Sequence, residues 1–147
     1  MLITKTFKHC ISKRYHHEEC RDVYSRYGER LAVIELDECG SALSLSVYDP
    51  HSEYGFDTQL VRNATIESWN ENVLIFKGAI GRVGVKIEIE LDSQNGDIVK
   101  LTEHHSNSGY LMLTNDDSTL QNEIIELQNK QVREYDSPRQ RLHKKDF

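Results

Sequence analysis

Residues 83–91 read Val-Gly-Val-Lys-Ile-Glu-Ile-Glu-Leu, in which apolar side chains alternate with glycine or charged ones. Apolar residues at every second position share one face of an extended strand, whereas in a helix they would not form one stripe. The stretch therefore predicts a β-strand with one buried face and one acidic face, which carries Glu88 and Glu90. The Asn-Gly pair at 95 and 96 that follows is typical of a tight turn.

The same alternation occurs on both sides of this strand. Residues 31–37 and 43–48 alternate around a turn at 38–41, which predicts a hairpin. The other predicted strands are 54–60, 64–69, 73–76, 98–103 and 110–114. We expect seven or eight strands, and their links are too short for crossover helices, so the pairing should be antiparallel. The predicted fold class is mainly β, as an antiparallel β-sandwich or a barrel-like meander.

Both ends of the chain carry helical signals. Residues 119–135 place Leu120, Ile124 and Leu127 on one stripe behind an acidic N-cap cluster, which predicts an amphipathic C-terminal helix. Residues 12–28 also fit a helix, but their tyrosines favour a strand. Both interpretations of the N-terminal segment stay open.

Length and composition indicate one folded domain. The chain has 147 residues, 37% hydrophobic and 29% charged, which suffices for one hydrophobic core. We expect a β-rich domain over residues 1–135 and a basic tail over 136–147.

Charge and cysteine usage narrow the function classes. The formal net charge is −6, which disfavours nucleic-acid binding and favours a basic partner. No apolar stretch is long enough to span a membrane or to act as a signal peptide. The three cysteines form no C-x-x-C pair, which is typical of reduced thiols. We therefore expect a cytoplasmic protein.

Histidines provide the main candidates for chemistry. His16 and Cys20 would lie one turn apart in a helix, and His104 and His105 could complete a zinc site. The spacings match no zinc motif, and Glu103 beside the second pair is interpreted as part of a polar loop. We therefore expect no metal, no cofactor and no catalytic residue, and lean against an enzyme.

Aromatic residues on the outer faces are candidates for partner binding. The alternation places Trp69 with Glu67, opposite Ile66, and places Tyr48 with two serines. The predicted partner-binding residues are Trp69, Tyr48, Glu67, Glu88, Glu90 and Asp37. The alternative is that each ring packs beneath a terminal segment or the helix.

Three functions remain. The first is an inhibitor that neutralises a basic, nuclease-like toxin or enzyme by binding, a profile shared in general terms by bacterial immunity proteins. The second is a small-molecule-binding or enzymatic barrel with an internal pocket, in which Thr58 and Arg82 would point inward. The third is an assembly subunit that oligomerises through its helix. The sequence does not distinguish a monomer from a dimer.

Overall fold

The fold is described here from a computed structural model, which covers residues 1–52, 58–107 and 109–135. The predicted basic tail at 136–147 and residues 54–57 of the predicted strand at 54–60 lie outside these residues. The strands are β1 (Leu2–Phe7), β2 (His9–His16), β3 (Arg21–Tyr27), β4 (Arg30–Leu36), β5 (Ala42–Tyr48), β6 (Gln59–Asn70), β7 (Val73–Ile80), β8 (Val83–Leu91), β9 (Ile98–His105), β10 (Tyr110–Thr114) and β11 (Arg133–Glu134). The helix is α1 (Asp117–Asn129).

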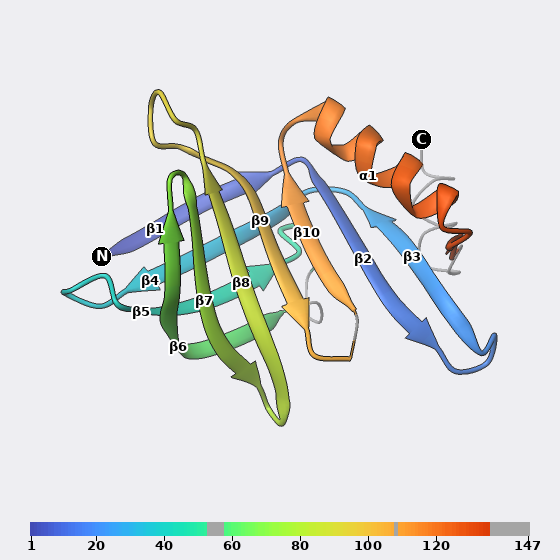
Figure 1. The fold of residues 1–147 in the computed structure, drawn as a ribbon, viewed down its shortest axis with the longest axis horizontal. Helices are drawn as coiled ribbons and strands as arrows, with labels where there is room; N and C mark the ends of the chain where they lie inside the picture. Colours follow the sequence, from blue (N-terminus) through green and yellow to red (C-terminus); the bar gives the residue numbers. More distant parts are fainter. Residues whose placement is uncertain (53–57, 108, 136–147) are drawn as a thin grey trace.

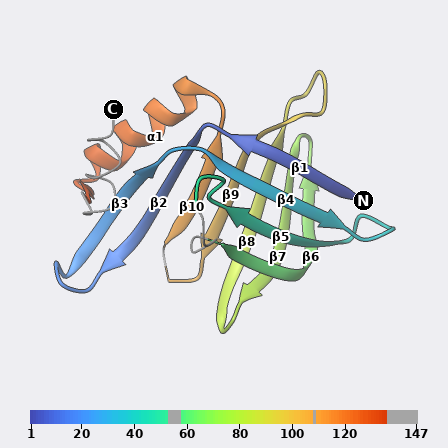
Figure 2. The ribbon, with the colours of Figure 1, turned by 180° about the vertical axis from the view of Figure 1, so that it is seen from behind.

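All of these strands belong to one sheet. Their order is β1-β4-β5-β6-β7-β8-β9-β10-β2-β3-β11, and each neighbouring pair is antiparallel except β3 and β11. The sheet curls strongly into a half-barrel (Figures 1 and 2). The prediction of a mainly β, barrel-like fold is thereby confirmed, as a single curled sheet with more strands than expected.

The first four strands form one long, bent hairpin. Only Lys8 separates β1 from β2, and only residues 28–29 separate β3 from β4. β1 pairs with β4, whereas β2 pairs with β3 and also with β10. Asn115 holds the bend, because its side chain accepts from the Lys8 N–H at 2.7 Å and donates to the Thr6 carbonyl at 3.0 Å.

The helical interpretation of residues 12–28 is wrong. These residues form β2, a turn and β3, and the reason lies in the burial of both faces of β3. Tyr24 packs beneath α1, while Val23 and Ser25 are buried on the opposite face. Consecutive buried residues hide the two-residue period of a strand, so the sequence pattern resembles a helical stripe.

The C-terminal helix is confirmed, but it ends at Asn129 rather than near residue 135. Gln131 adopts a positive φ of 62°, and the Val132 N–H returns to the Leu127 carbonyl at 2.9 Å, which terminates the helix. The chain then pairs with β3 as β11. At the other end, hydrogen bonds from Thr119 and Ser118 hold the pKa of the N-cap Asp116 below its usual value.

Two cores stabilise the structure. The larger core fills the concave side of the curl, and the smaller one lies between α1 and the convex side of β10, β2 and β3. Leu120, Ile124 and Leu127 are all buried in the smaller core. The apolar stripe of α1 therefore packs against the sheet of the same chain. These three side chains are not available for the helix-mediated assembly that the third hypothesis requires.

A close approach of β6 and β7 gives a stability prediction. A Cβ atom on Gly78 would lie 2.8 Å from the Cβ of Ala64 and 3.1 Å from Cγ1 of Val61. We expect Gly78→Ala to lower the free energy of unfolding by about 1–3 kcal/mol through overpacking, measured by chemical denaturation. Adding Ala64→Gly should recover part of the loss.

The matched control for this prediction is Gly84→Ala. The nearest atom to a Cβ at Gly84 is 3.9 Å away, so this variant should retain nearly the wild-type stability. If both alanine variants unfold at the same denaturant concentration, close packing at Gly78 is not the cause.

Candidate functional site

A β-bulge changes the face on which Trp69 lies. Ile66 pairs with Phe76 but Ser68 pairs with Ile75, so Glu67 is an extra residue in β6. Beyond the bulge, Trp69 is directly opposite Leu74, whose own neighbour on β8 is the buried Ile89. Directly opposed side chains share a face, so Trp69 lies on the concave face. Its predicted exposure is confirmed at 64%, but its assignment to the outer face is wrong.

Trp69 lies at one end of the curl, together with three turns. Residues 37–41, 71–72 and 92–97 connect β4 to β5, β6 to β7 and β8 to β9. Alternate connections of an antiparallel meander lie at the same end of the sheet, and both views place them on the side of the N-terminus (Figures 1 and 2). We call this end the acidic mouth. The partly buried apolar residues that line it are Ile3, Leu36, Leu74, Leu91 and Ile98.

The turns of the acidic mouth carry a single sign of charge. Their ionisable side chains, cysteine aside, are Asp37, Glu38, Glu71, Asp92 and Asp97, and these three turns contain no lysine, arginine or histidine. Hydrogen bonds from the backbone of Ala42 and from Ser41 lower the pKa of Asp37 below its usual range. The mouth therefore combines an apolar floor with a negatively charged rim at neutral pH.

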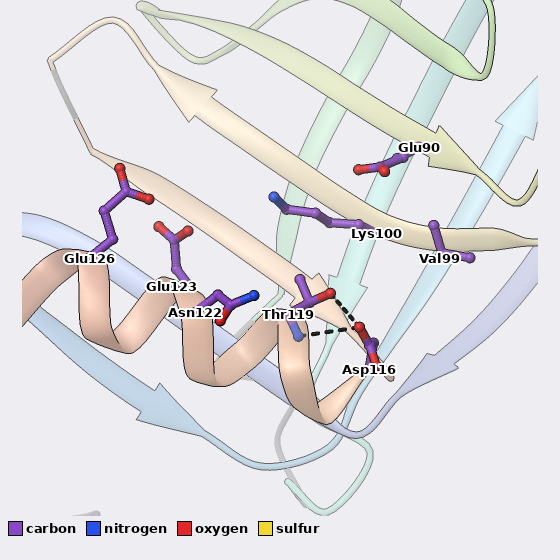
Figure 3. Close-up of a pocket in the computed structure, with 8 residues that line it drawn as sticks. All are labelled: Glu90, Val99, Lys100, Asp116, Thr119, Asn122, Glu123 and Glu126. Atoms are coloured by element: carbon purple, nitrogen blue, oxygen red, sulfur yellow. Dashed lines mark hydrogen bonds between the residues drawn. The ribbon is translucent and has the colours of Figure 1, made fainter.

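A second acidic surface adjoins it along α1. A cleft of about 720 Å³ runs between the helix and the convex face of β8 and β9 (Figure 3). Its charged lining residues are Glu90, Lys100, Asp116, Glu123 and Glu126. The hydroxyl group of Tyr110 donates to Glu123. Burial is the main cause that raises the pKa of Tyr110, and this hydrogen bond raises it further. The cleft extends the negative surface from the mouth along the helix.

The remaining predicted partner-binding residues are dispersed. Tyr48 is 37% exposed, but it lies at the opposite end of β5 from the acidic mouth. Glu67 forms an ion pair with Lys86 at 3.3 Å on the convex face, and Glu88 lies on the same face of β8. The structure thus gathers Trp69 and Asp37 at the mouth, with Glu90 beside it.

The four metal candidates do not converge. His16 stacks against Tyr135, and Cys20 is exposed in the β2–β3 turn, so they flank a turn instead of sharing a helical face. His104 and His105 point to opposite faces of β9 because they are consecutive strand residues. Within residues 1–52, 58–107 and 109–135, no group of three or more His, Cys, Asp or Glu side chains is arranged to hold a metal ion.

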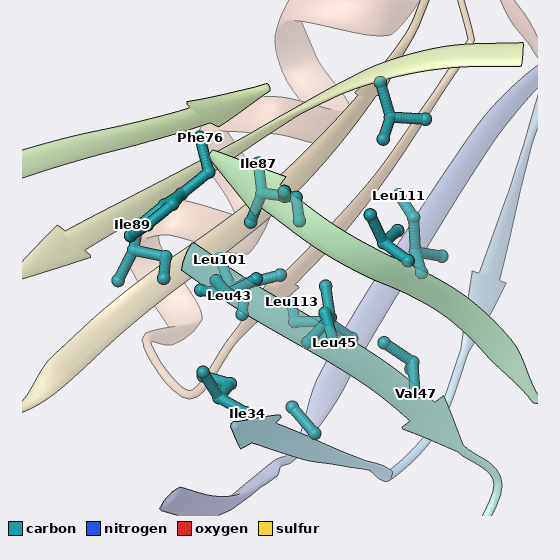
Figure 4. Close-up of a cluster of buried hydrophobic side chains, with 14 of the residues drawn as sticks. Ile34, Leu43, Leu45, Val47, Phe76, Ile87, Ile89, Leu101, Leu111 and Leu113 are labelled. Carbon is teal, nitrogen blue, oxygen red and sulfur yellow. The ribbon is translucent and has the colours of Figure 1, made fainter. Parts of the chain in front are cut away.

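The interior of the curl contains an ionisable pair that the polar-loop interpretation missed. Glu103 is fully buried, and its Oε1 lies 2.6 Å from Nε2 of His105. It lies between Ile87 and Leu111, which face the core (Figure 4). Leu101 and Glu103 fall on the same face of β9, so strict alternation would have predicted that this carboxyl group points inward.

The pocket required by the second functional hypothesis is small. A partly open pocket on the concave side has a volume of about 70 Å³ and is lined by Cys10, Ser12, Tyr27, Arg30, Val47 and Leu111. Pockets for drug-sized ligands typically measure a few hundred Å³ or more. The two predicted inward polar residues, Thr58 and Arg82, are both exposed, and Arg82 lies in the β7–β8 turn.

Comparison with known proteins gives no relative: no family model, no curated protein and no solved structure matches this chain. In the part of the chain that the structure describes, no helix is both long and apolar enough to cross a membrane.

Proposed function

We propose that this chain is a protein-binding module that docks a basic protein at the acidic mouth and thereby inhibits it. The partner fits the chemistry of a basic, nuclease-like toxin or enzyme, and the chain then acts as an immunity-type protein in a bacterial cell. The observation that carries the proposal is the exposed Trp69 within a rim of five carboxylates that contains no basic residue.

Two physical effects support this assignment. The ammonium group of Met1 donates to the Leu36 carbonyl at 2.9 Å beside this rim, but the five carboxylates leave the rim net negative. A net negative rim attracts a positively charged protein and accelerates association. An exposed tryptophan beside an apolar floor provides the aromatic anchor around which binding energy concentrates. The net charge of −6 adds to the same attraction.

The test begins with affinity capture from the native host and continues with the purified partner. In a double variant, Glu38→Lys with Asp97→Lys, the mouth loses two negative charges and gains two positive ones. The carboxylates of Glu38 and Asp97 make no hydrogen bond in the described structure, so the turns should stay intact. We expect the association rate to fall at least about tenfold at low salt and the difference to shrink as salt rises.

The matched control, Glu18→Lys with Glu29→Lys, changes the net charge equally. Glu18 lies in the β2–β3 turn and Glu29 before β4, and both are exposed. If the two double variants slow association equally, net charge and not the mouth directs the partner. A captured partner that is acidic, or whose activity is unaffected by binding, would contradict the proposed function.

A further inference from the structure

The indole ring of Trp69 is held in one orientation by the turn that follows it. Its Nε1–H donates to the Glu71 carbonyl at 3.1 Å, and Glu71 adopts a positive φ of 54°. This bond uses the only polar atom of the side chain, while Trp69 stays 64% exposed. The ring therefore offers a partner its face and its apolar edge, because its one hydrogen-bond donor is already engaged.

The three turns of the acidic mouth are bonded to the same part of the sheet. The Ile66 N–H donates to the Ser41 carbonyl at 2.9 Å, which joins the β4–β5 turn to the strand that carries the ring. Asn72 and Leu91 exchange hydrogen bonds of 2.8 and 2.9 Å, which join the β6–β7 turn to the end of β8, where the β8–β9 turn begins. These bonds hold the three acidic turns around the end of β6 at which Trp69 lies.

The carboxylates of the mouth are spread along these turns instead of converging on one point. Among the residues that the structure describes, no three His, Cys, Asp or Glu side chains are placed to hold a metal ion. The ammonium group of Met1 beside the rim donates to the Leu36 carbonyl. A dispersed negative rim beside an aromatic face is complementary to a flat, delocalised cation, whose N–H groups point in several directions.

We propose that the basic partner inserts an arginine side chain into the acidic mouth and stacks its guanidinium group on the face of Trp69, an inference that rests on the proposed function. The negative face of a tryptophan ring attracts a cation placed over it. A guanidinium group that lies flat on the ring directs its N–H groups sideways, in its own plane, toward the acidic turns. The ammonium group of lysine is a strongly hydrated point charge, so it gains less from the same surface.

The test is an NMR titration of the full chain with capped tripeptides, acetyl-Gly-X-Gly-amide, in which X is arginine, lysine or citrulline. Citrulline is the matched control, because it has nearly the planar shape of arginine but no charge. We expect saturable shifts of the Trp69 indole N–H signal with the arginine peptide. Its apparent Kd should be at least about fivefold below that of the citrulline peptide and about twofold below that of the lysine peptide.

Two changes to the ring separate the effect of its face from that of its apolar bulk. Trp69→Leu keeps a large apolar side chain without an aromatic face, so the affinity for the arginine peptide, read at the amide signals of residues 70–72, should fall at least about threefold. Incorporation of 5-fluorotryptophan at this single tryptophan withdraws electron density from the ring with little change of shape and should weaken binding about twofold. Tyr48→Leu, at the other end of the curl, should bind the arginine peptide like the wild type.

Equal affinity for the arginine and citrulline peptides would overturn the inference. Wild-type arginine binding in Trp69→Leu, or the absence of a saturable shift with the arginine peptide, would overturn it as well. If those results accompany a captured basic partner that still depends on Trp69, the proposed function stands and the ring is an apolar anchor. If the arginine peptide binds as expected but no captured partner is inhibited, the proposed function fails and the arginine site remains.

Discussion

Replacing His105 with alanine is expected to lower the free energy of unfolding by about 3 kcal/mol. The substitution removes the hydrogen-bond partner of Glu103, whose carboxyl group is fully buried and whose second oxygen already has none. Breaking one side of a buried ionisable pair typically costs about 3–5 kcal/mol. We take the lower end because 23% of the His105 side chain is exposed. Urea denaturation of both proteins measures the difference.

His104→Ala is the matched control for this prediction. His104 is the neighbouring residue on the exposed face of β9, so its removal should change stability by less than about 0.5 kcal/mol. Adding Glu103→Leu to His105→Ala should recover much of the loss, because an apolar side chain replaces the unpartnered carboxyl group. Equal stability of the two alanine variants would show that the pair contributes nothing.

The alternation of apolar and polar residues predicted those strands in which one face is buried and the other is exposed to solvent. In β8, Val85, Ile87 and Ile89 are buried, as the pattern of residues 83–91 requires. The pattern failed at β3, where Val23, Tyr24 and Ser25 are all buried. Val23 and Ser25 are buried on the face opposite α1, whereas Tyr24 is buried beneath α1, which lies about 100 residues later in the chain. A local pattern contains no information about such a distant covering element.

The location of the site could be predicted only in part. Sequence alone indicated that Trp69 is exposed and included Asp37 in the site, but it did not predict the other mouth carboxylates, Glu38, Glu71, Asp92 and Asp97. Its face depended on one extra residue at Glu67, and a bulge of this kind shifts every later side chain of the strand to the other face. The acidic mouth also requires the strand order, because its three turns come together only when the sheet curls. The inward direction of Glu103, in contrast, follows from alternation with Leu101.

Trp69→Ala is expected to weaken partner binding by at least about 2 kcal/mol, or roughly 30-fold in Kd, as for other aromatic anchors. The loss should appear mainly in the dissociation rate, in contrast to the salt-sensitive association defect of the charge variants. Trp69 is the single tryptophan of the chain, so its fluorescence reports on the mouth directly. Its emission should shift to shorter wavelength when a tryptophan-free form of the partner docks and buries the ring.

Tyr48→Ala is the matched control, because Tyr48 is an exposed aromatic residue at the other end of the curl. Wild-type affinity in this variant, together with weak binding in Trp69→Ala, would assign the contact to the mouth. The opposite result, or an emission spectrum that does not change on binding, would place the docking surface elsewhere on the sheet. Charge reversal at Glu38 and Asp97 separates the two contributions, because a partner held only by electrostatic attraction would respond to the charges and not to the ring.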